Sequence, residues 1–488
     1  MRLAFLIFFC ASVAMAQGAP PCGNYVDQSE PADTFSSGNS SIKFRLPHAT
    51  GSANTIIGGI MGSPNTYTLS DDAGNTYTTS TQTDATNGQV SIIFFATIST
   101  TSANPAITIS ENATDQVLGA WAMECVGTWV SDVSGGARGT TSTVAAGSLI
   151  PSATGDLVVQ TAWDDNNATP AVSSITAGTN FTLVSADRAM YGFSGQAQLY
   201  NSTSALNASY TISATHTGFV TRAVFFKKTA TGTAFPGGLQ VNCMKTFWIN
   251  TTAFQSGASA GLPRTEQWAC PSSNGTASTS AIFEWLAGGS GVLTSVVDGS
   301  SETFNMDAAA TCPGGGAGCV RTAYYCGATL NSTQTVTVSG TADSDSAKMY
   351  GVNGLATSSS SACFDKQVTA NGTQAAAGNI NAGSITPTTS NGLVIGGLSV
   401  ANNTMNGVTG SGQLFTGCRW GNQTVGNGGC DQNNGWAYYL NPNTSSVNFT
   451  YTEFDGSTAA GAWVFRADAF EAPSSGAATI PQVFVIHP

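Results

Sequence analysis

The sequence predicts an all-β protein made of tandem β-sandwich domains, immunoglobulin-like or jelly-roll, in two duplicated units. Short runs rich in Val, Ile, Thr, Phe and Tyr are separated by turns rich in Gly, Asn, Asp and Ser, which is the pattern of antiparallel strands. No long segment keeps a 3.6-residue apolar period between capping residues, so we expect no substantial helices. Several segments recur in the same order, which indicates a duplication.

The N-terminus has the features of a secretory signal peptide. Arg2 precedes a short apolar run, and Ala14-Met15-Ala16 forms a small-x-small cleavage site. Such a segment is removed on export, so we expect cleavage after residue 16. The mature protein is therefore expected to be secreted, and to act in the extracellular space or at the cell surface.

The composition argues against nucleic-acid binding and against a membrane-spanning helix. The 488 residues carry a formal net charge of −12, and only 9% of them are charged, against about 25% in an average soluble domain. No cluster of Lys and Arg is present to neutralise phosphates, so we expect no nucleic-acid partner. No stretch after the signal peptide is apolar for the roughly 20 residues of a membrane helix, so no membrane span is expected.

The cysteines are predicted to form disulfides. Removal of Cys10 with the signal peptide leaves ten, and an even number in an exported chain is typical of disulfide bonding. The cysteines lack zinc-like spacing, so no zinc site and no cofactor are expected. Calcium binding at Asp343 and Asp345 stays open, because calcium takes clustered oxygen ligands, although no EF-hand-like loop accompanies them. The candidate pairs are one in the N-terminal half and two that would close Gly- or Asn-rich loops: Cys22–Cys125, Cys312–Cys319 and Cys418–Cys430.

An internal duplication sets the domain organisation. Residues 146–151, Ala-Gly-Ser-Leu-Ile-Pro, return at 382–387 as Ala-Gly-Ser-Ile-Thr-Pro. Two later pairs of segments are separated by the same number of residues: 210–212 matches 449–451, and 223–227 matches 462–466. Each unit is long enough for two sandwiches. The expected boundaries are 1–16 for the signal peptide, 17–126 and 127–228 for the first two sandwiches, 229–237 for a linker, 238–367 and 368–468 for the next two, and 469–488 for a C-terminal tail.

The order of these motifs resembles a group of known proteins. Asp72-Ala73-Gly74-Asn75-Thr76-Tyr77 is followed by an aromatic strand at 92–95, a Thr/Ile strand at 106–110, and the Gly-Asp-Leu-Val-Val run at 155–159. This order is similar to that of uncharacterised bacterial exported proteins with tandem immunoglobulin-like sandwiches. The resemblance implies a fold and a surface or extracellular location, and it brings no catalytic residues with it.

One motif suggests catalysis. Residues 257–261 spell Gly-Ala-Ser-Ala-Gly, but a nucleophile elbow needs a helix after its serine, and Pro263 follows Ser259 closely. A general base would have to come from three histidines in no recognisable context: His48, His216 and His487. We therefore predict that the protein is not an enzyme, and a hydrolase is only the third hypothesis.

Two other features suggest binding. Four aromatic residues surround the predicted Cys418–Cys430 loop, and aromatic rings beside amides can stack on sugars: Trp420, Trp436, Tyr438 and Tyr439. In the tail, an apolar segment follows a flexible link and could add a strand to its own domain or to another copy: Val483, Phe484, Val485 and Ile486.

These features predict a secreted structural or adhesive protein whose partners are copies of itself, in a filament, or surface glycans. The alternative is a carbohydrate-binding protein that uses the four aromatic residues of the last domain. The sequence motifs do not decide between self-assembly and glycan binding, because the fold alone does not identify a partner.

Overall fold

The computed structural model confirms the all-β prediction. It describes residues 26–473 with these exceptions: 29–31, 35–38, 47–48, 103–104, 116–117, 165–171, 173, 188–191, 214–217, 235–238, 251–263, 271–277, 288–291, 308–318, 331–333, 342–343, 375–378, 401–404, 410–413, 416–433, 442 and 454–460. Every regular element in this described part is a β-strand. It contains no helix that could cross a membrane.

The strands group into four sandwiches, named here 1A, 1B, 2A and 2B in chain order. Sandwich 1A has β1 (Val26–Gln28), β2 (Ala32–Thr34), β3 (Asn39–Arg45), β4 (Thr55–Gly62), β5 (Tyr67–Asp71), β6 (Thr78–Asp84), β7 (Gln89–Thr97), β8 (Ala106–Asp115) and β9 (Leu118–Cys125). Sandwich 1B has β10 (Thr128–Gly139), β11 (Thr143–Leu149), β12 (Asp156–Asp164), β13 (Ser174–Thr176), β14 (Thr182–Asp187), β15 (Phe193–Tyr200), β16 (Leu206–Ser213) and β17 (Phe219–Ala230).

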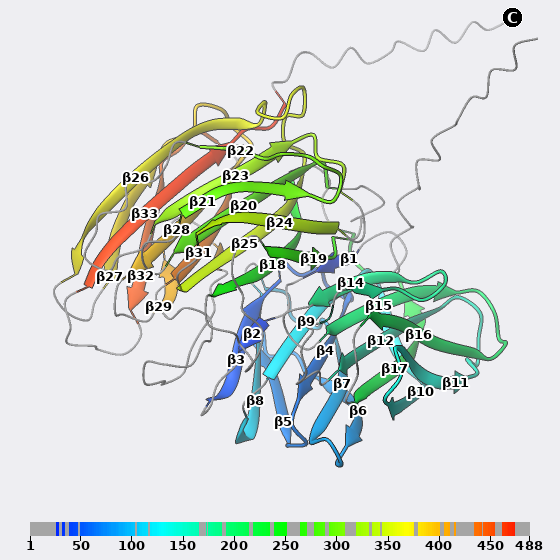
Figure 1. Ribbon diagram of the computed structural model, residues 1–488. Coiled ribbons are helices and arrows are strands. Elements are labelled where there is room, and N and C mark those ends of the chain that lie inside the picture. Colours follow the sequence, from blue (N-terminus) through cyan, green and yellow to red (C-terminus); the bar gives the residue numbers. More distant parts are fainter. Residues whose placement is uncertain are drawn as a thin grey trace, which may run out of the picture.

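The second unit repeats this series. Sandwich 2A has β18 (Gln240–Asn250), β19 (Arg264–Trp268), β20 (Ser280–Ala287), β21 (Val292–Asp298), β22 (Asn305–Met306), β23 (Val320–Cys326), β24 (Gln334–Thr341) and β25 (Ser344–Asn353). Sandwich 2B has β26 (Phe364–Gln374), β27 (Asn379–Ile385), β28 (Gly392–Val400), β29 (Met405–Thr409), β30 (Leu414–Phe415), β31 (Asn434–Asn441), β32 (Val447–Glu453) and β33 (Gly461–Phe470). Figure 1 shows the blue-to-teal strands of the first unit in one group and the green-to-red strands of the second in another.

All four sandwiches share one connectivity. In 1B the large sheet has the order β10-β17-β12-β15-β14 and the small sheet the order β11-β16-β13, and 2A and 2B repeat these orders strand for strand. Sandwich 1A differs only in that two short strands, β1 and β2, both pair with β9 at the sheet edge. The first strand of each sandwich lies beside the last, whereas an immunoglobulin domain pairs its first strand with its second. Of the two predicted alternatives, the connectivity is therefore that of a jelly roll.

The large sheets of each unit pack face to face. One apolar cluster joins β4, β7 and β9 of 1A to β10, β12, β15 and β17 of 1B, and includes Trp121, Trp129 and Phe226. A second joins β18, β20, β23 and β25 of 2A to β28, β31 and β33 of 2B. Every residue of β4, β9, β12 and β28 is buried as a result. An antiparallel sheet with one wet face alternates apolar and polar residues, and these strands do not, because both of their faces are covered.

Strand pairing corrects the alignment of the two copies. The Tyr210 hydroxyl donates to the carbonyl of Gln160, and the Tyr451 hydroxyl donates to that of Gly396, which is the position equivalent to Gln160 in the 146/382 alignment. Tyr210 therefore corresponds to Tyr451, and the predicted match of 210–212 with 449–451 is wrong by two residues.

The final strand needs a larger correction. Leu157 pairs with Phe226, and its equivalent Leu393 pairs with Phe470. The match of 223–227 with 462–466 is therefore wrong by five residues. The single spacing assumed from the sequence fails because the loops between these strands are longer in the second unit.

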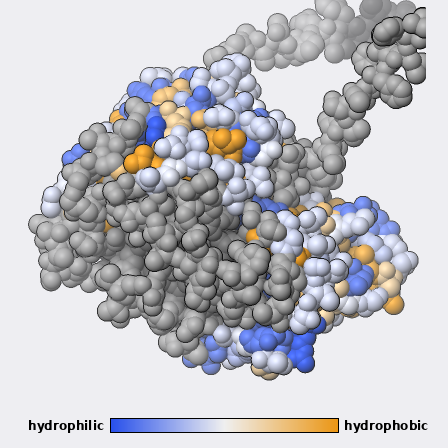
Figure 2. Space-filling model, in the orientation of Figure 1, coloured by the Kyte–Doolittle hydropathy of each residue, from blue (hydrophilic) through white to orange (hydrophobic). Residues whose placement is uncertain are grey.

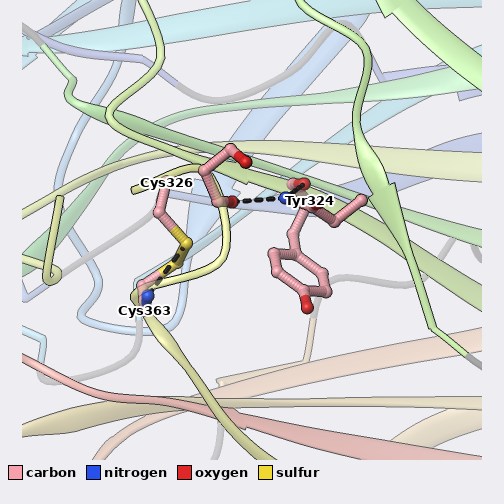
Figure 3. The surroundings of a disulfide bond; sticks show 5 residues. Tyr324, Cys326 and Cys363 are labelled. Carbon is pink, nitrogen blue, oxygen red and sulfur yellow. Dashed lines mark hydrogen bonds between the residues drawn. A yellow bond between two sulfur atoms is a disulfide. The ribbon is translucent and has the colours of Figure 1, made fainter. Parts of the chain in front are cut away.

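Disulfides connect parts of the second unit. Cys243–Cys270 spans the core between the two sheets of 2A, and Cys326–Cys363 joins the end of β23 to the start of 2B. Figure 3 shows the latter bond near Tyr324, whose ring stacks on that of Phe364 with 5.0 Å between centroids. Neither pair was predicted. Such bonds indicate an oxidising environment, as expected outside the cytosol.

The predicted disulfide pairs are only partly within the described residues. Cys125 and Cys319, which belong to two of the predicted pairs, are disulfide-bonded. Cys22 and Cys312 lie outside the described residues, so their pairing stays a prediction. The third pair, Cys418–Cys430, lies wholly outside them.

Candidate functional site: a buried charged cluster

The predicted sugar-binding aromatics are mostly packed inside the protein. Trp436 is 1% exposed and Tyr438 is 0% exposed, and both lie in the contact between 2A and 2B. Tyr439 is half-buried against the core of 2B, and Trp420 lies outside the described residues. A sugar needs a free ring face to stack on, so the geometry gives Trp436 and Tyr438 a packing role.

The other candidates from the sequence lie outside the described residues. These are Ser259, His48, His216, His487 and the tail segment Val483, Phe484, Val485 and Ile486. In the part of the chain that is described, no group of three or more His, Cys, Asp or Glu side chains is arranged to hold a metal ion.

The structure instead reveals a cluster of charged side chains between 2A and 2B. Glu284 on β20 and Lys348 on β25 come from 2A, together with Asp307, which follows β22. Arg466 and Asp468 come from β33 of 2B. Four of these residues are 0% exposed and Asp307 is 7% exposed. Charged groups are almost never buried unless they are paired, so a cluster of five in one interface requires an explanation.

Arg466 is the centre of the hydrogen-bonded half of the cluster. Its Nε lies 2.9 Å from Oδ2 of Asp468, and its Nη2 also donates to Asp468, at 2.9 Å from Oδ1. Nη2 donates to Asp307 of the opposite sandwich as well, and to Gln367 on β26. The Thr322 hydroxyl of 2A donates to Asp468 at 2.7 Å. These bonds cross the interface in both directions and satisfy the buried guanidinium.

Glu284 forms the other half of the cluster, and its carboxyl group is shielded from water. It lies directly across from Lys348 on the neighbouring strand, but neither of its carboxyl oxygens has a hydrogen-bond partner among the described residues. It points at β28 of 2B, where a Cβ built on Gly397 would lie 2.4 Å from its Oε1. A glycine at position 397 therefore leaves the space that this carboxyl occupies.

Burial raises the pKa of two carboxyl groups in the cluster. Desolvation, followed by the charge of Asp468, raises the pKa of Glu284 well above its ordinary value, although Arg466 and Lys348 oppose the shift. Desolvation and Asp468 also raise the pKa of Asp307 to about 8, against the effect of Arg466. Removing a carboxylate from water favours its neutral form, which is the physical cause in both cases.

The first unit has the same interface without this charge. The fifth residue of β20, Glu284, corresponds to the fifth residue of β4, Gly59. The strand neighbour of Gly59 is Trp121, in the place of Lys348. The indole of Trp121 donates to the Thr161 hydroxyl of 1B at 3.2 Å. Two jelly rolls can therefore pair in this way around a tryptophan, so the fold itself does not require the charges.

The arginine site is shared, but its partners differ. Arg222 pairs with Thr161 as Arg466 pairs with Gly397, and it donates to the hydroxyls of Ser80 and Ser134 at 2.9 and 2.7 Å. Neutral acceptors in the first unit thus stand where the second has Asp307 and Gln367. The copies have therefore diverged at the arginine site as well as at the positions of Glu284 and Lys348.

Sequence reasoning missed the whole cluster. A usable signal was present, because the charges interrupt otherwise apolar strands, as in Ile-Phe-Glu-Trp-Leu at 282–286 and Phe-Arg-Ala-Asp-Ala at 465–469. A charge in such a strand has to be paired or neutralised.

Comparison with known proteins adds no relative. No protein-family model matches the chain, and no curated protein matches it.

Proposed function

We propose that the protein is a secreted structural or adhesive component of the extracellular space or cell surface. The observation that carries this proposal is the pairing of the jelly rolls through their large sheets. Each sandwich packs its large sheet against that of its neighbour, which favours a stiff scaffold over an open binding sheet. Disulfides within 2A and between 2A and 2B add to this stiffness.

The surface supports a role in polar contacts. The large apolar side chains found exposed in the described part are those of Val130, Ile150 and Val292. In Figure 2 the coloured surface is mostly pale, with small orange areas and a blue region at the lower edge. Partners would therefore meet hydroxyl and amide groups, which suits glycans or the polar edges of other copies.

Assembly is the first property to measure. We would examine the chain lacking residues 1–16 by light scattering after size exclusion and by negative-stain microscopy, under non-reducing conditions. The matched variant also lacks 474–488 but keeps Glu471, whose backbone bonds to Cys363 and Ala356. Fibres or large oligomers that disappear in the shorter variant would support a filament subunit joined by its tail.

Adhesion is tested on the same samples. If both are monomers, binding to a glycan array that is lost in Trp420→Ala would support the adhesive form of the proposal. Monomers that bind no glycan would contradict it. Ester hydrolysis abolished by Ser259→Ala would also overturn it, in favour of an enzyme.

A further inference from the structure

We propose that the interface between 2A and 2B is a proton-dependent lock, in which Glu284 carries a proton in the closed pair and opens the interface when it ionises. This inference goes beyond the structural role and does not depend on it. It rests on three features of the described residues: a fully buried carboxyl without a hydrogen bond, the charged groups around it, and a second copy of the interface in which Gly59 and Trp121 replace Glu284 and Lys348.

The titratable groups that interact with Glu284 lie on β25 and β33, just beyond β22, and on β32, which carries the Tyr451 hydroxyl. Lys348 is the strand neighbour of Glu284 on β25, and Arg466 and Asp468 face it from β33. The charge of Asp307, just beyond β22, also interacts electrostatically with Glu284. Arg321 on β23 interacts electrostatically with Asp307 and Arg466. The Arg466 guanidinium already donates to Asp468 and Asp307. The ammonium of Lys348 lies 5.6 Å from the ring centroid of Trp436.

Ionisation would therefore leave a buried charge with poor compensation. The Glu284 carboxyl is packed against the backbone of Gly397, and no described donor is within hydrogen-bond distance of it. Such a charge becomes stable once water reaches it, which requires β20 and β28 to separate. The Cys326–Cys363 bond would keep the sandwiches attached while the interface opens.

The direction of the effect follows from linkage. The closed state holds the proton more tightly than the open state, where Glu284 ionises near its ordinary value. The equilibrium therefore shifts toward the open state as the pH rises from that ordinary value to the pKa of the closed state, by up to about tenfold per pH unit for one proton. Below this range the lock is fully closed.

Amide hydrogen exchange of the full chain between pH 5 and 9 tests this proposal. We would compare protection of β20, β28 and β33 in the wild type and in Glu284→Gln, which keeps the shape of the side chain and cannot ionise. The ratio of the two proteins cancels the pH dependence of intrinsic exchange, and Asp307 is present in both. We expect the variant to gain protection over the wild type by up to about tenfold per pH unit through the ionisation range.

The control is Glu124→Gln, another fully buried glutamate, in the first unit. Its carboxylate accepts hydrogen bonds from the backbone of Gly51 and the side chain of Asn54, so this variant should leave the pH profile of β20, β28 and β33 unchanged. The proposal would be overturned if the ratio of amide protection in the wild type to that in Glu284→Gln stayed constant from pH 5 to 9.

The wild type alone provides a second test should Glu284→Gln not fold. Its β4 and β12 strands form the equivalent interface around Gly59 and Trp121. Protection of β20 and β28 should fall relative to β4 and β12 as the pH rises. Equal profiles in the two units would contradict a lock in the second.

Discussion

Tyr210 and Tyr451 show how single residues mark the duplication. Each ring is buried in the core of its sandwich, and each hydroxyl donates to a carbonyl of the central strand. Tyr210 also donates to the carbonyl of Ser194 at 3.2 Å. Desolvation raises the pKa of both hydroxyls far above the ordinary value.

Removing either hydroxyl should weaken its sandwich. We expect Tyr210→Phe and Tyr451→Phe to lower the free energy of unfolding by about 1 kcal/mol each, since a net hydrogen bond contributes about that much. Urea denaturation followed by tryptophan fluorescence would measure this. The control is Tyr200→Phe, whose hydroxyl bonds only at an exposed loop. A loss in the control as large as in the other two would show that the buried bonds are not the cause.

At the scale of elements, a bulge explains the repeated Ala-Gly-Ser motif. In β11 the pairing register shifts between Ala145 and Ser148, and in β27 it shifts between Asn381 and Gly383. Gly147 and Gly383 have φ values of +88° and +133°, which glycine adopts easily and other residues do not. The motif that revealed the duplication is therefore a bulge in the first strand of the small sheets of 1B and 2B.

Gly147 tests the conformational cost alone. Nothing lies within 4 Å of a Cβ built there, so Gly147→Ala meets no steric obstacle and should lose about 1 kcal/mol of stability through its positive φ. Gly147→Asn should lose less, because asparagine tolerates the left-handed region better. Equilibrium denaturation of both variants provides the comparison. An alanine variant as stable as the wild type would contradict the assignment.

At the scale of the whole molecule, the side chains of Lys245 and Gln267 hydrogen-bond the second unit to the first. The buried Lys245 ammonium donates to the carbonyls of Ala186 in 1B and Gln267 in 2A, at 2.7 and 2.6 Å. The Gln267 amide in turn exchanges two hydrogen bonds with the backbone of Ile175. A side chain thus pairs with β13 at the edge of its sheet, covering polar backbone groups that would attract another chain.

Loss of this contact should loosen the units from each other. Lys245→Met keeps the apolar stem and removes the charge-assisted bonds, so we expect a loss of about 2–4 kcal/mol in the free energy of unfolding. We also expect a larger radius of gyration by small-angle X-ray scattering. Lys366→Met, at a half-buried position, is the control. If Lys245→Met had the same radius of gyration and the same free energy of unfolding as the control, Lys245 would not be holding the units together.

The sequence by itself determined the strands, the turns and the duplication. These depend on interactions between neighbouring residues, such as the turn closed by Asp71, whose carboxylate accepts from the backbone of Ala73 and Asn75. Alternation of side chains and turn chemistry are local, so they can be recognised without the fold.

The tertiary structure alone decided which faces meet. Whether Trp436 is a binding surface or a packing residue depends on the sandwich opposite it, and so does the electrostatic effect of the β33 charges on Glu284. The disulfides Cys243–Cys270 and Cys326–Cys363 likewise depend on distances between strands. Burial and contact depend on segments that are far apart in the chain. A local sequence pattern reflects only interactions between neighbouring residues, so it does not reveal them.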